Sequence, residues 1–252
     1  MKILVSQKQP SNLTPYEPLK KKFGAEIEFK PFFLIEPLSS REFRAQRINL
    51  QDYTAVVFSS RHAIDAYFQL AENLRFKVPD TMKYFCTTEL VAMYLQKHIV
   101  YRKRKIFYGD GKPESVVALI GPKHKGEKFL ITASEGSDVS NLTTLFDKAG
   151  LDYTVGTFVK SVPQDLTTVD FASCDVVVLY NKFDINALYA SYPDFQQGDL
   201  KMIAYGKSIA KAMEEAGLEI AAQGPTPATP SAAKTIETYL DSCAKGKGAA
   251  RK

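Results

Sequence analysis

Short apolar runs alternate with amphipathic segments along most of the chain. Runs of apolar and β-branched residues predict strands at 3–5, 25–29, 55–58, 83–86, 129–131, 176–179 and 201–204. The intervening segments have helical spacing, and in one of them Ile64, Phe68 and Leu74 fall on one face. We therefore predict helices over 16–23, 61–74, 89–97, 140–149, 183–190 and 207–216, and a last helix that ends near Cys243. This alternation indicates an α/β fold with parallel sheets.

Two stretches of the chain share one pattern. VVFSSRHAIDA at 56–66 and VVLYNKFDINA at 177–187 align without a gap, so that strand, turn and helix positions correspond. The match favours an internal duplication and hence two lobes. The general grammar of α/β proteins could also produce part of it. Two extended, proline-bounded stretches at 31–37 and 157–163 are suited to cross from one lobe to the other.

The turns that follow the predicted strands are rich in hydroxyl and small residues. They are Ser59-Ser60, Thr87-Thr88, Thr132-Ala133-Ser134, Asn181-Lys182 and Gly206-Lys207-Ser208. In open α/β sheets ligands bind at the carboxyl ends of the strands, and helix N-termini there favour anions. These turns therefore predict an anion-binding site. The alternative interpretation is that their Ser and Thr side chains only cap helices.

The composition is that of an ordinary globular protein: 252 residues, of which 45% are apolar and 24% charged. The three cysteines, Cys86, Cys174 and Cys243, form neither a disulfide framework nor a CxxC motif, and the first two lie in or beside apolar runs. The start of the chain lacks the long apolar region of a signal peptide, and no run approaches the ~18 apolar residues of a membrane span. We expect a cytoplasmic protein that does not enter a membrane.

The formal net charge of +5 comes largely from two basic groups. One lies in a Gly/Ala-rich tail, 244–252, that we expect to be disordered. The other is a basic cluster, Lys97–Lys105, in the folded part of the chain. A nucleic-acid-binding or anion-responsive protein would need these residues on one face with aromatic neighbours, for which Tyr101 and Phe107 are available. The pattern of the cluster indicates the end of a helix that runs into a strand, and not basic residues gathered on one face. We therefore expect no nucleic-acid partner.

Several kinds of site have no sequence signal. There is no GxGxxG after the first strand, no GxxxxGK[ST], and no GxSxG around Ser134. His62, His98 and His124 have no partners at metal-ligand spacing. We therefore expect neither a cofactor nor a metal. An enzyme built on this chain would act by binding and orienting its substrate.

The turn motifs and their order resemble those of the uroporphyrinogen-III synthase family over about residues 1–241. Phe58-Ser59-Ser60 is similar to that family's Phe-(Ser/Thr)-Ser turn, and 206–210 lies where the family has Gly-Pro-Thr-Thr-Ala at the start of a helix. Gly217 and then Pro225-Thr226-Pro227 follow in the same order. The strand at 129–131 and the helix at 140–149 match a unit of the family's inserted lobe.

The resemblance implies two small parallel-sheet, flavodoxin-like α/β lobes joined by two extended crossings, with an inter-lobe cleft. Lobe 1 would comprise 1–35 and 163–252, with the N-terminal strand paired into the C-terminal part, and lobe 2 would comprise 36–162. The implied reaction is the cofactor-independent cyclisation of hydroxymethylbilane, a linear tetrapyrrole with many carboxylates, to uroporphyrinogen III with inversion of the last ring. The resemblance implies a lyase of haem biosynthesis. The sequence leaves the oligomeric state open, and we expect a monomer. Its substrate-binding residues would be Ser59, Ser60, Thr87, Thr88, Ser134, Asn181, Lys182, Gly206, Lys207 and Ser208.

The chain departs from the family at three places. Phe158 aligns with a family tyrosine that is thought to assist departure of the hydroxyl group, and phenylalanine has no proton to give. Asn181-Lys182-Phe183-Asp184 replaces a Ser-Pro-Ser-Gly-like turn with a charge pair and a bulky ring, and Ile209 replaces one of two paired threonines. Two interpretations stay open: an active enzyme, slower than its relatives, or a catalytically impaired tetrapyrrole- or anion-binding module.

Overall fold

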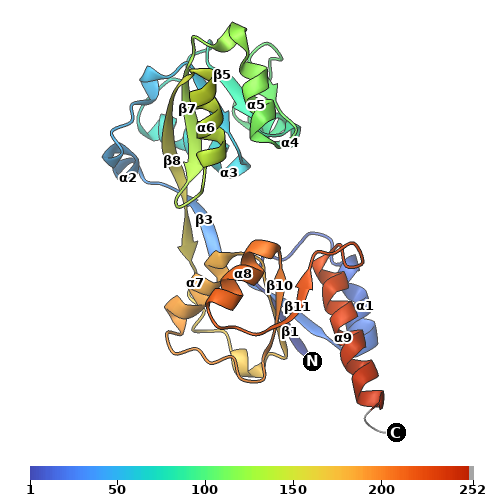
Figure 1. Ribbon diagram of the computed structural model, residues 1–252. Helices are drawn as coiled ribbons and strands as arrows, with labels where there is room; N and C mark the ends of the chain where they lie inside the picture. The colour runs from blue at the N-terminus through green and yellow to red at the C-terminus, as the bar shows by residue number, and fades with distance from the viewer. Residues whose placement is uncertain (250–252) are drawn as a thin grey trace. The chain divides into compact units, whose positions relative to one another are not determined.

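The computed structural model describes the backbone of residues 1–249 and the side chains of residues 1–244. The chain divides into two compact units. The first comprises Met1–Leu34 together with the chain from Val162 onward, and the second comprises Ile35–Ser161. Each unit is an α/β layer structure, coloured along the chain in Figure 1, and each is described below by itself.

The first unit is built on a five-stranded sheet in the order β11-β10-β9-β1-β2. Its strands are β1 (Lys2–Val5), β2 (Glu26–Phe29), β9 (Val176–Leu179), β10 (Lys201–Tyr205) and β11 (Ile220–Gly224). All neighbours pair in parallel, and Leu4 of β1 lies opposite Val177 of β9. This pairing confirms that the N-terminal strand joins the C-terminal part of the chain. Counted along the chain, the strand order is the 2-1-3-4-5 order of flavodoxin-like sheets.

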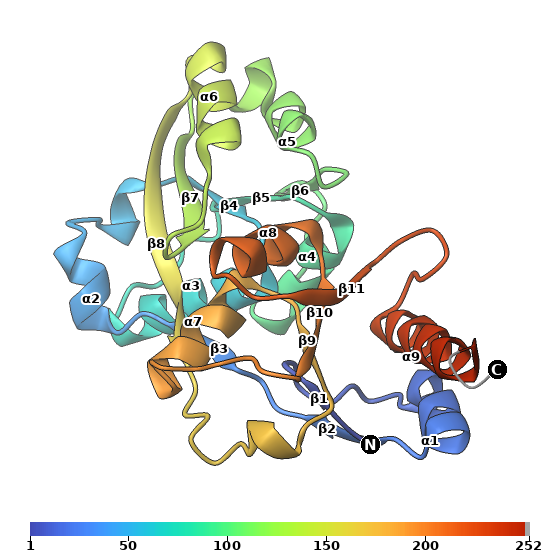
Figure 2. The same ribbon diagram turned by 60° about the horizontal axis from the view of Figure 1, so that its bottom comes forward.

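Helices cover both faces of this sheet. Figures 1 and 2 show α1 (Glu17–Phe23) and α9 (Ala232–Ala249) side by side on one face, with α7 (Lys182–Ser191) and α8 (Lys207–Glu215) on the other. Successive strand residues point to opposite faces. Ile3 accordingly packs in the core under α1 and α9, whereas Leu4 packs in the core under α7 and α8. Alternate apolar positions of each strand thus fill two separate cores.

The second unit is built on a six-stranded sheet in the order β3-β8-β7-β4-β5-β6. Strands β4 to β8 pair in parallel. The strands are β3 (Phe33–Pro37), β4 (Ala55–Phe58), β5 (Lys83–Cys86), β6 (Ile106–Tyr108), β7 (Lys128–Ser134) and β8 (Asp152–Pro163). The helices are α2 (Ser40–Ala45), α3 (Arg61–Asn73) and α4 (Glu89–Tyr94) over one core, and α5 (Pro113–Ile120) and α6 (Ser140–Ala149) over the other.

The two stretches that share a sequence pattern occupy equivalent places. The stretch 56–66 runs from β4 into α3, and the stretch 177–187 runs from β9 into α7. Both strands are central in their sheets, since β8-β7-β4-β5-β6 corresponds strand for strand to β2-β1-β9-β10-β11. The matched residues Ser60 and Asn181 are both N-caps that accept a helix amide. This correspondence supports the internal duplication.

The sequence analysis missed β6, β11, α2 and α5. Strand β6 has only three residues and follows the basic cluster, and β11 reads IAAQG, which has one β-branched residue. The predicted end of the last helix near Cys243 is wrong, because α9 continues through Ala249. The added residues, 244–249, are two alanines, two lysines and two glycines, with no proline to stop the helix. The expectation of a disordered tail at 244–252 stays a prediction, and 250–252 lie outside the described residues.

Candidate functional site

The carboxyl ends of three neighbouring strands form one edge of the first unit. Ser6 follows β1, Asn181 follows β9 after Tyr180, and Gly206 follows β10. The Ser6 amide donates to the Val178 carbonyl at 3.0 Å, and Leu179 lies opposite Ala204. The structure therefore brings the expected turns 181–182 and 206–208 together. It adds Ser6, which sequence reasoning missed although it directly follows the first predicted strand.

Helix α8 begins without a side-chain cap. Its N-cap is Gly206, with φ of 141°, a conformation that side-chain-bearing residues rarely adopt. Lys207 and Ser208 follow on the exposed first turn, and Ile209 is buried in the core. Lys207 makes no ion pair among the described side chains. An uncapped helix N-terminus beside an unpaired lysine and a hydroxyl suits a carboxylate ligand.

Helix α7 begins in the opposite way, with its amides bonded to its own side chains. The Asn181 side chain accepts the Phe183 amide at 3.2 Å. Asp184 Oδ2 accepts the Tyr180 amide at 2.7 Å, the Asn181 amide at 3.0 Å and the Ser6 hydroxyl at 2.7 Å. These bonds form a capping box and tie the ends of β1 and β9 together. The N-x-x-D pattern of 181–184 was the sequence signal for this arrangement.

The expected charge pair in this turn is corrected by the structure. Asp184 is fully buried, whereas Lys182 is exposed and lies over the Phe183 ring at 5.5 Å from its centroid. The Phe183 ring in turn lies 5.5 Å from that of Phe33. Asp184 Oδ1 is buried with no hydrogen-bond partner among the described residues. Burial raises the pKa of Asp184 above its ordinary value, although the Ser6 hydroxyl and the two amides act in the opposite direction.

In the second unit, the ends of β4 and β5 lie side by side, and the Thr87 amide donates to the Phe58 carbonyl at 3.0 Å. The structure therefore brings Ser59-Ser60 and Thr87-Thr88 together. The Ser60 hydroxyl accepts the Ala63 amide at 3.1 Å, and the Thr88 hydroxyl accepts the Val91 amide at 3.3 Å. These two hydroxyls therefore cap helices, as the alternative interpretation held, whereas the Ser59 side chain is exposed.

Ser134 does not open a helix, contrary to expectation. It ends β7 and enters a turn in which the Ser137 hydroxyl donates to the Ser134 carbonyl at 2.7 Å, and α6 starts only at Ser140. Sequence reasoning also missed the loop after β6. Its Gly109 and Gly111 amides donate to the carbonyls at the end of β5. A Cβ on Gly109 would meet the Ser115 hydroxyl, so that this side chain would have to move.

Phe158 reaches no surface. It is fully buried in the core of the second unit, with its ring centroid 4.9 Å from that of Phe43 and 5.9 Å from that of Tyr67. The pairing of β7 with β8 shifts at this point, so that Ala133 lies opposite Thr157 but Ser134 lies opposite Val159. Such a bulge turns side chains to the other face of the strand. The expectation of a substrate-facing Phe158 is therefore wrong, because counting along an unbroken strand does not allow for the extra residue.

The basic cluster 97–105 is partly bound to its own unit. Lys97 Nζ and His98 Nε2 both bond to Asp65 Oδ1, at 2.9 and 2.7 Å. Tyr101 and Phe107, the aromatic neighbours that base stacking would need, are half-buried and pack against the cores. This arrangement does not favour a nucleic-acid surface. Among the described residues no cluster of potential metal ligands occurs, and no helix is long and apolar enough to cross a membrane.

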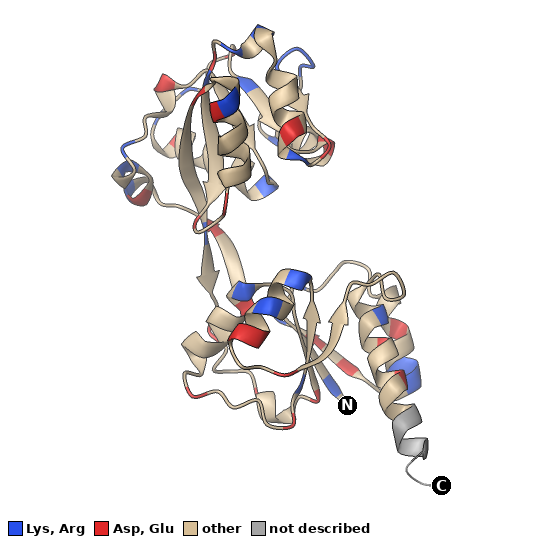
Figure 3. Ribbon diagram, viewed as in Figure 1, with Lys and Arg blue, Asp and Glu red and all other residues tan. Residues whose placement is uncertain are grey.

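Charge separates the two ends of the first unit. Figure 3 shows basic residues at the start of α8 and around it, near the carboxyl ends of the strands, and acidic residues along the loops at the amino ends. The last residues of α8, Glu214 and Glu215, are acidic as well. A net positive edge attracts anions and raises their rate of encounter. The part of the first unit that suits a carboxylate is therefore the edge formed by Asn181-Lys182 and Gly206-Lys207-Ser208.

Comparison with known proteins identifies the family and the fold of the chain. The family model "Uroporphyrinogen-III synthase HemD" matches residues 15–234. A crystal structure of uroporphyrinogen-III synthetase from Helicobacter pylori is similar with a TM-score of 0.59 at 16% identity, over 95% of this chain and 98% of that one. A mutant uroporphyrinogen III synthase from Thermus thermophilus gives 0.52 at 14%, over 97% and 99%. No curated protein sequence matches significantly. The chain, with its two parallel α/β units, belongs to the uroporphyrinogen-III synthase family of tetrapyrrole biosynthesis.

Proposed function

We propose that this protein cyclises hydroxymethylbilane to uroporphyrinogen III with inversion of the last ring, without a cofactor. Family membership supports a tetrapyrrole as the substrate class. The substrate in this proposal is linear and has carboxylate side chains. The observation that carries the proposal is the uncapped start of α8 at Gly206, with Lys207 and Ser208 exposed beside it. Amides, hydroxyl and ammonium there can hold one of the substrate carboxylates.

Within this proposal the protein acts by binding the substrate in the geometry that the ring closure needs. The substrate takes up a proton and loses its hydroxyl group as water. The resulting cation closes on the last ring with inversion of that ring, and a proton is released. The Lys207 and Ser208 turn would bind carboxylates and so fix which atoms approach one another. Phe158 and Ile209 are both buried, so neither side chain is available to the substrate. The lack of a proton on Phe158 therefore does not bear on the rate of this step.

One observation favours the second function, a tetrapyrrole-binding module without activity. At the start of α7 the Tyr180 and Asn181 amides are both donated to Asp184, so that they are not available to a substrate carboxylate. A carboxylate held there also repels a second one. The first unit therefore offers one strong carboxylate-binding turn, at α8, where two adjacent helix starts could have offered two.

The direct test feeds freshly made hydroxymethylbilane to the purified protein and separates the type I and type III isomers after oxidation. We expect type III product above the uncatalysed background, which contains type I. The type I isomer alone, together with saturable binding of uroporphyrin III, would leave the binding-module function. If neither product nor binding is found, both functions are excluded for this chain.

The lysines at the two turns provide a second prediction. Replacing both Lys182 and Lys207 with alanine should weaken uroporphyrin III binding about tenfold at low salt, measured by fluorescence titration. The loss should shrink at high salt, because the Debye length falls from about 10 Å at 0.1 M to about 3 Å at 1 M. A matched control, Lys20→Ala/Lys21→Ala, removes the same charge from exposed positions on α1. Equal weakening by both pairs would show that net charge, not this site, attracts the porphyrin.

A further inference from the structure

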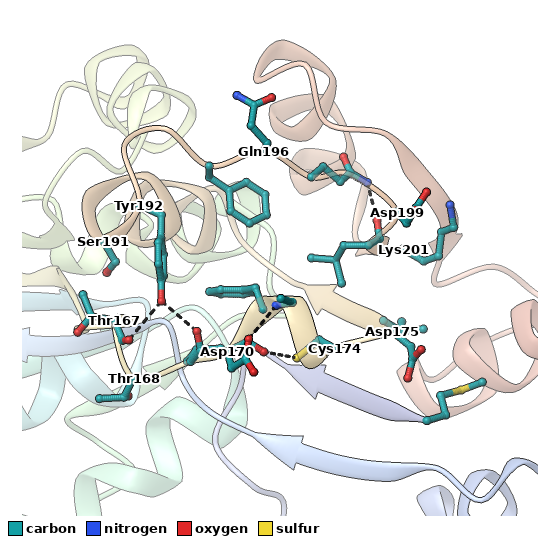
Figure 4. Close-up of a pocket in the computed structure, with 18 of the residues that line it drawn as sticks. Thr167, Thr168, Asp170, Cys174, Asp175, Ser191, Tyr192, Gln196, Asp199 and Lys201 are labelled. Carbon is teal, nitrogen blue, oxygen red and sulfur yellow. Dashed lines mark hydrogen bonds between the residues drawn. The ribbon is translucent and has the colours of Figure 1, made fainter.

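A large pocket lies at the other end of the first sheet. It has a volume of about 1230 Å³ and lies where β9 and β10 begin, at Val176 and Lys201. Its walls are the loop 167–175 before β9, the segment 191–201 before β10, and part of α9, and Figure 4 shows most of the lining side chains. The strand-end turns proposed to bind the substrate do not line it. It is thus separate from the carboxylate-binding edge.

Side-chain hydrogen bonds to the backbone hold both loops of the pocket. Tyr192 donates its hydroxyl to carbonyls of the loop 166–169, the shortest of these bonds being 2.9 Å to Val169, and Ser191 accepts the Leu166 amide at 3.0 Å. On the opposite wall Gln197 bonds to Leu200 and to both backbone groups of Glu219. The pocket is therefore formed before any ligand arrives, as is usual for small-molecule sites.

Three aromatic rings contribute to the walls. The Phe171 ring stands edge-on to Tyr192, with centroids 5.5 Å apart, and to Phe195, with centroids 5.7 Å apart. All three residues line the pocket and are half-buried, so that part of each ring stays accessible. Edge-to-face contact is the ordinary packing of aromatic rings. A ring face that stays open to the pocket carries the negative pole of the aromatic quadrupole and attracts ammonium groups.

The charged residues at the pocket also favour a cation. Asp170, Asp175, Asp194 and Asp199 line it, against Lys201 and the amino-terminal residue Met1. Asp170 and Asp175 accept backbone amides, at Ala172 and Lys2 respectively. Asp194 and Asp199 are exposed and make no ion pair or side-chain hydrogen bond among the described residues. An acidic pocket in a protein whose formal net charge is +5 is a local reversal of sign.

We propose that this pocket binds a small organic cation, an ammonium group on an apolar body. The rings of Phe171, Tyr192 and Phe195 would pack against the apolar body and the ammonium group. Asp194 and Asp199 would supply the negative charge that balances the cation. The inference does not depend on the cyclisation reaction, because the residues involved and the end of the sheet are different.

The test uses benzyltrimethylammonium as the probe, with benzyl alcohol and phenylacetate as neutral and anionic compounds of similar aromatic body. For each compound, the affinity for the full chain is measured by isothermal titration calorimetry, and the amide chemical shifts are measured by NMR. We expect saturable binding of the cation alone, with shifts confined to 166–175, 191–201 and the adjoining part of α9. Equal affinity for all three compounds, or no saturation by the cation, would overturn the proposal.

Two variants assign the binding to these groups. Asp194→Asn/Asp199→Asn should weaken binding of the cation about tenfold, and Phe195→Leu, which keeps an apolar side chain, should weaken it about threefold to tenfold. The matched control, Asp80→Asn/Asp152→Asn, removes two exposed carboxylates from the second unit and should leave affinity unchanged. Thermal unfolding checks that each variant is folded. Wild-type affinity in both pocket variants would place the cation elsewhere.

Discussion

Replacing Phe158 with alanine is expected to lower the free energy of unfolding by about 3–5 kcal/mol, the usual cost of deleting a buried phenylalanine ring. The ring is fully buried and packs against Phe43 and Tyr67 in the core of the second unit. Denaturant unfolding followed by circular dichroism measures the change. A loss below about 1 kcal/mol would mean that the ring is not in the core.

Phe158→Tyr separates a packing role from a catalytic one. If this position faced substrate, the added hydroxyl would speed formation of the type III isomer. We expect no gain, and a loss of stability of about 1–3 kcal/mol for a buried hydroxyl without a partner. Because the hydroxyl of Tyr67 is itself buried and unpaired, the substitution is also made in a Tyr67→Phe background, where the two cannot pair. Faster cyclisation without loss of stability would contradict the core placement.

Asp184→Ala is the second change with a large expected effect. It removes the acceptor for the Ser6 hydroxyl and for the amides of Tyr180 and Asn181, leaving three donors unpaired near the end of the first sheet. Hydrogen bonds to charged groups are worth about 1.5–3 kcal/mol each, but they are not additive, so we expect a loss of about 3 kcal/mol. Ser6→Ala, which leaves the two amide bonds in place, should cost less.

The pH dependence of the same site has a definite sign. Burial raises the pKa of Asp184 in the folded protein. The pKa of an aspartate in the unfolded chain is about 3.9. Between these two pKa values the native state holds more protons than the unfolded state, so that stability falls as the pH rises through the raised value. Asp184→Asn has no proton to lose there. Its stability relative to wild type should therefore improve from pH 4 to pH 7, and a decline would show that the hydrogen bonds lower the pKa.

Much of the fold followed from the sequence, because the pattern of each element is local. The runs at 55–58 and 176–179 are apolar at every position, as strands buried on both faces must be, and both form central parallel strands. The gapless match of 56–66 with 177–187 located two equivalent strand–turn–helix units. Where the pattern was short or weak, at β6 and β11, the sequence did not predict the strand.

The chemistry of the turns was only partly contained in the sequence. The positions of Ser60, Thr88 and Asn181 after strands predicted helix starts, and all three are N-caps. Whether a helix start stays available to a ligand depends on what its amides already bind. At the start of α7, the amides are bonded to the Asp184 carboxylate, which also accepts the hydroxyl of Ser6, 178 residues away along the chain.

Tertiary structure alone decided which side chains face the solvent at the irregular points. The bulge opposite Ala133 and Ser134 adds one residue to β8, so that counting from Gly150 cannot show which face Phe158 occupies. The acidic, aromatic pocket likewise joins loops that are separated in sequence and meet only because β9 and β10 start side by side. A strand or helix is specified by residues a few positions apart, whereas a binding surface is specified by which strands become neighbours.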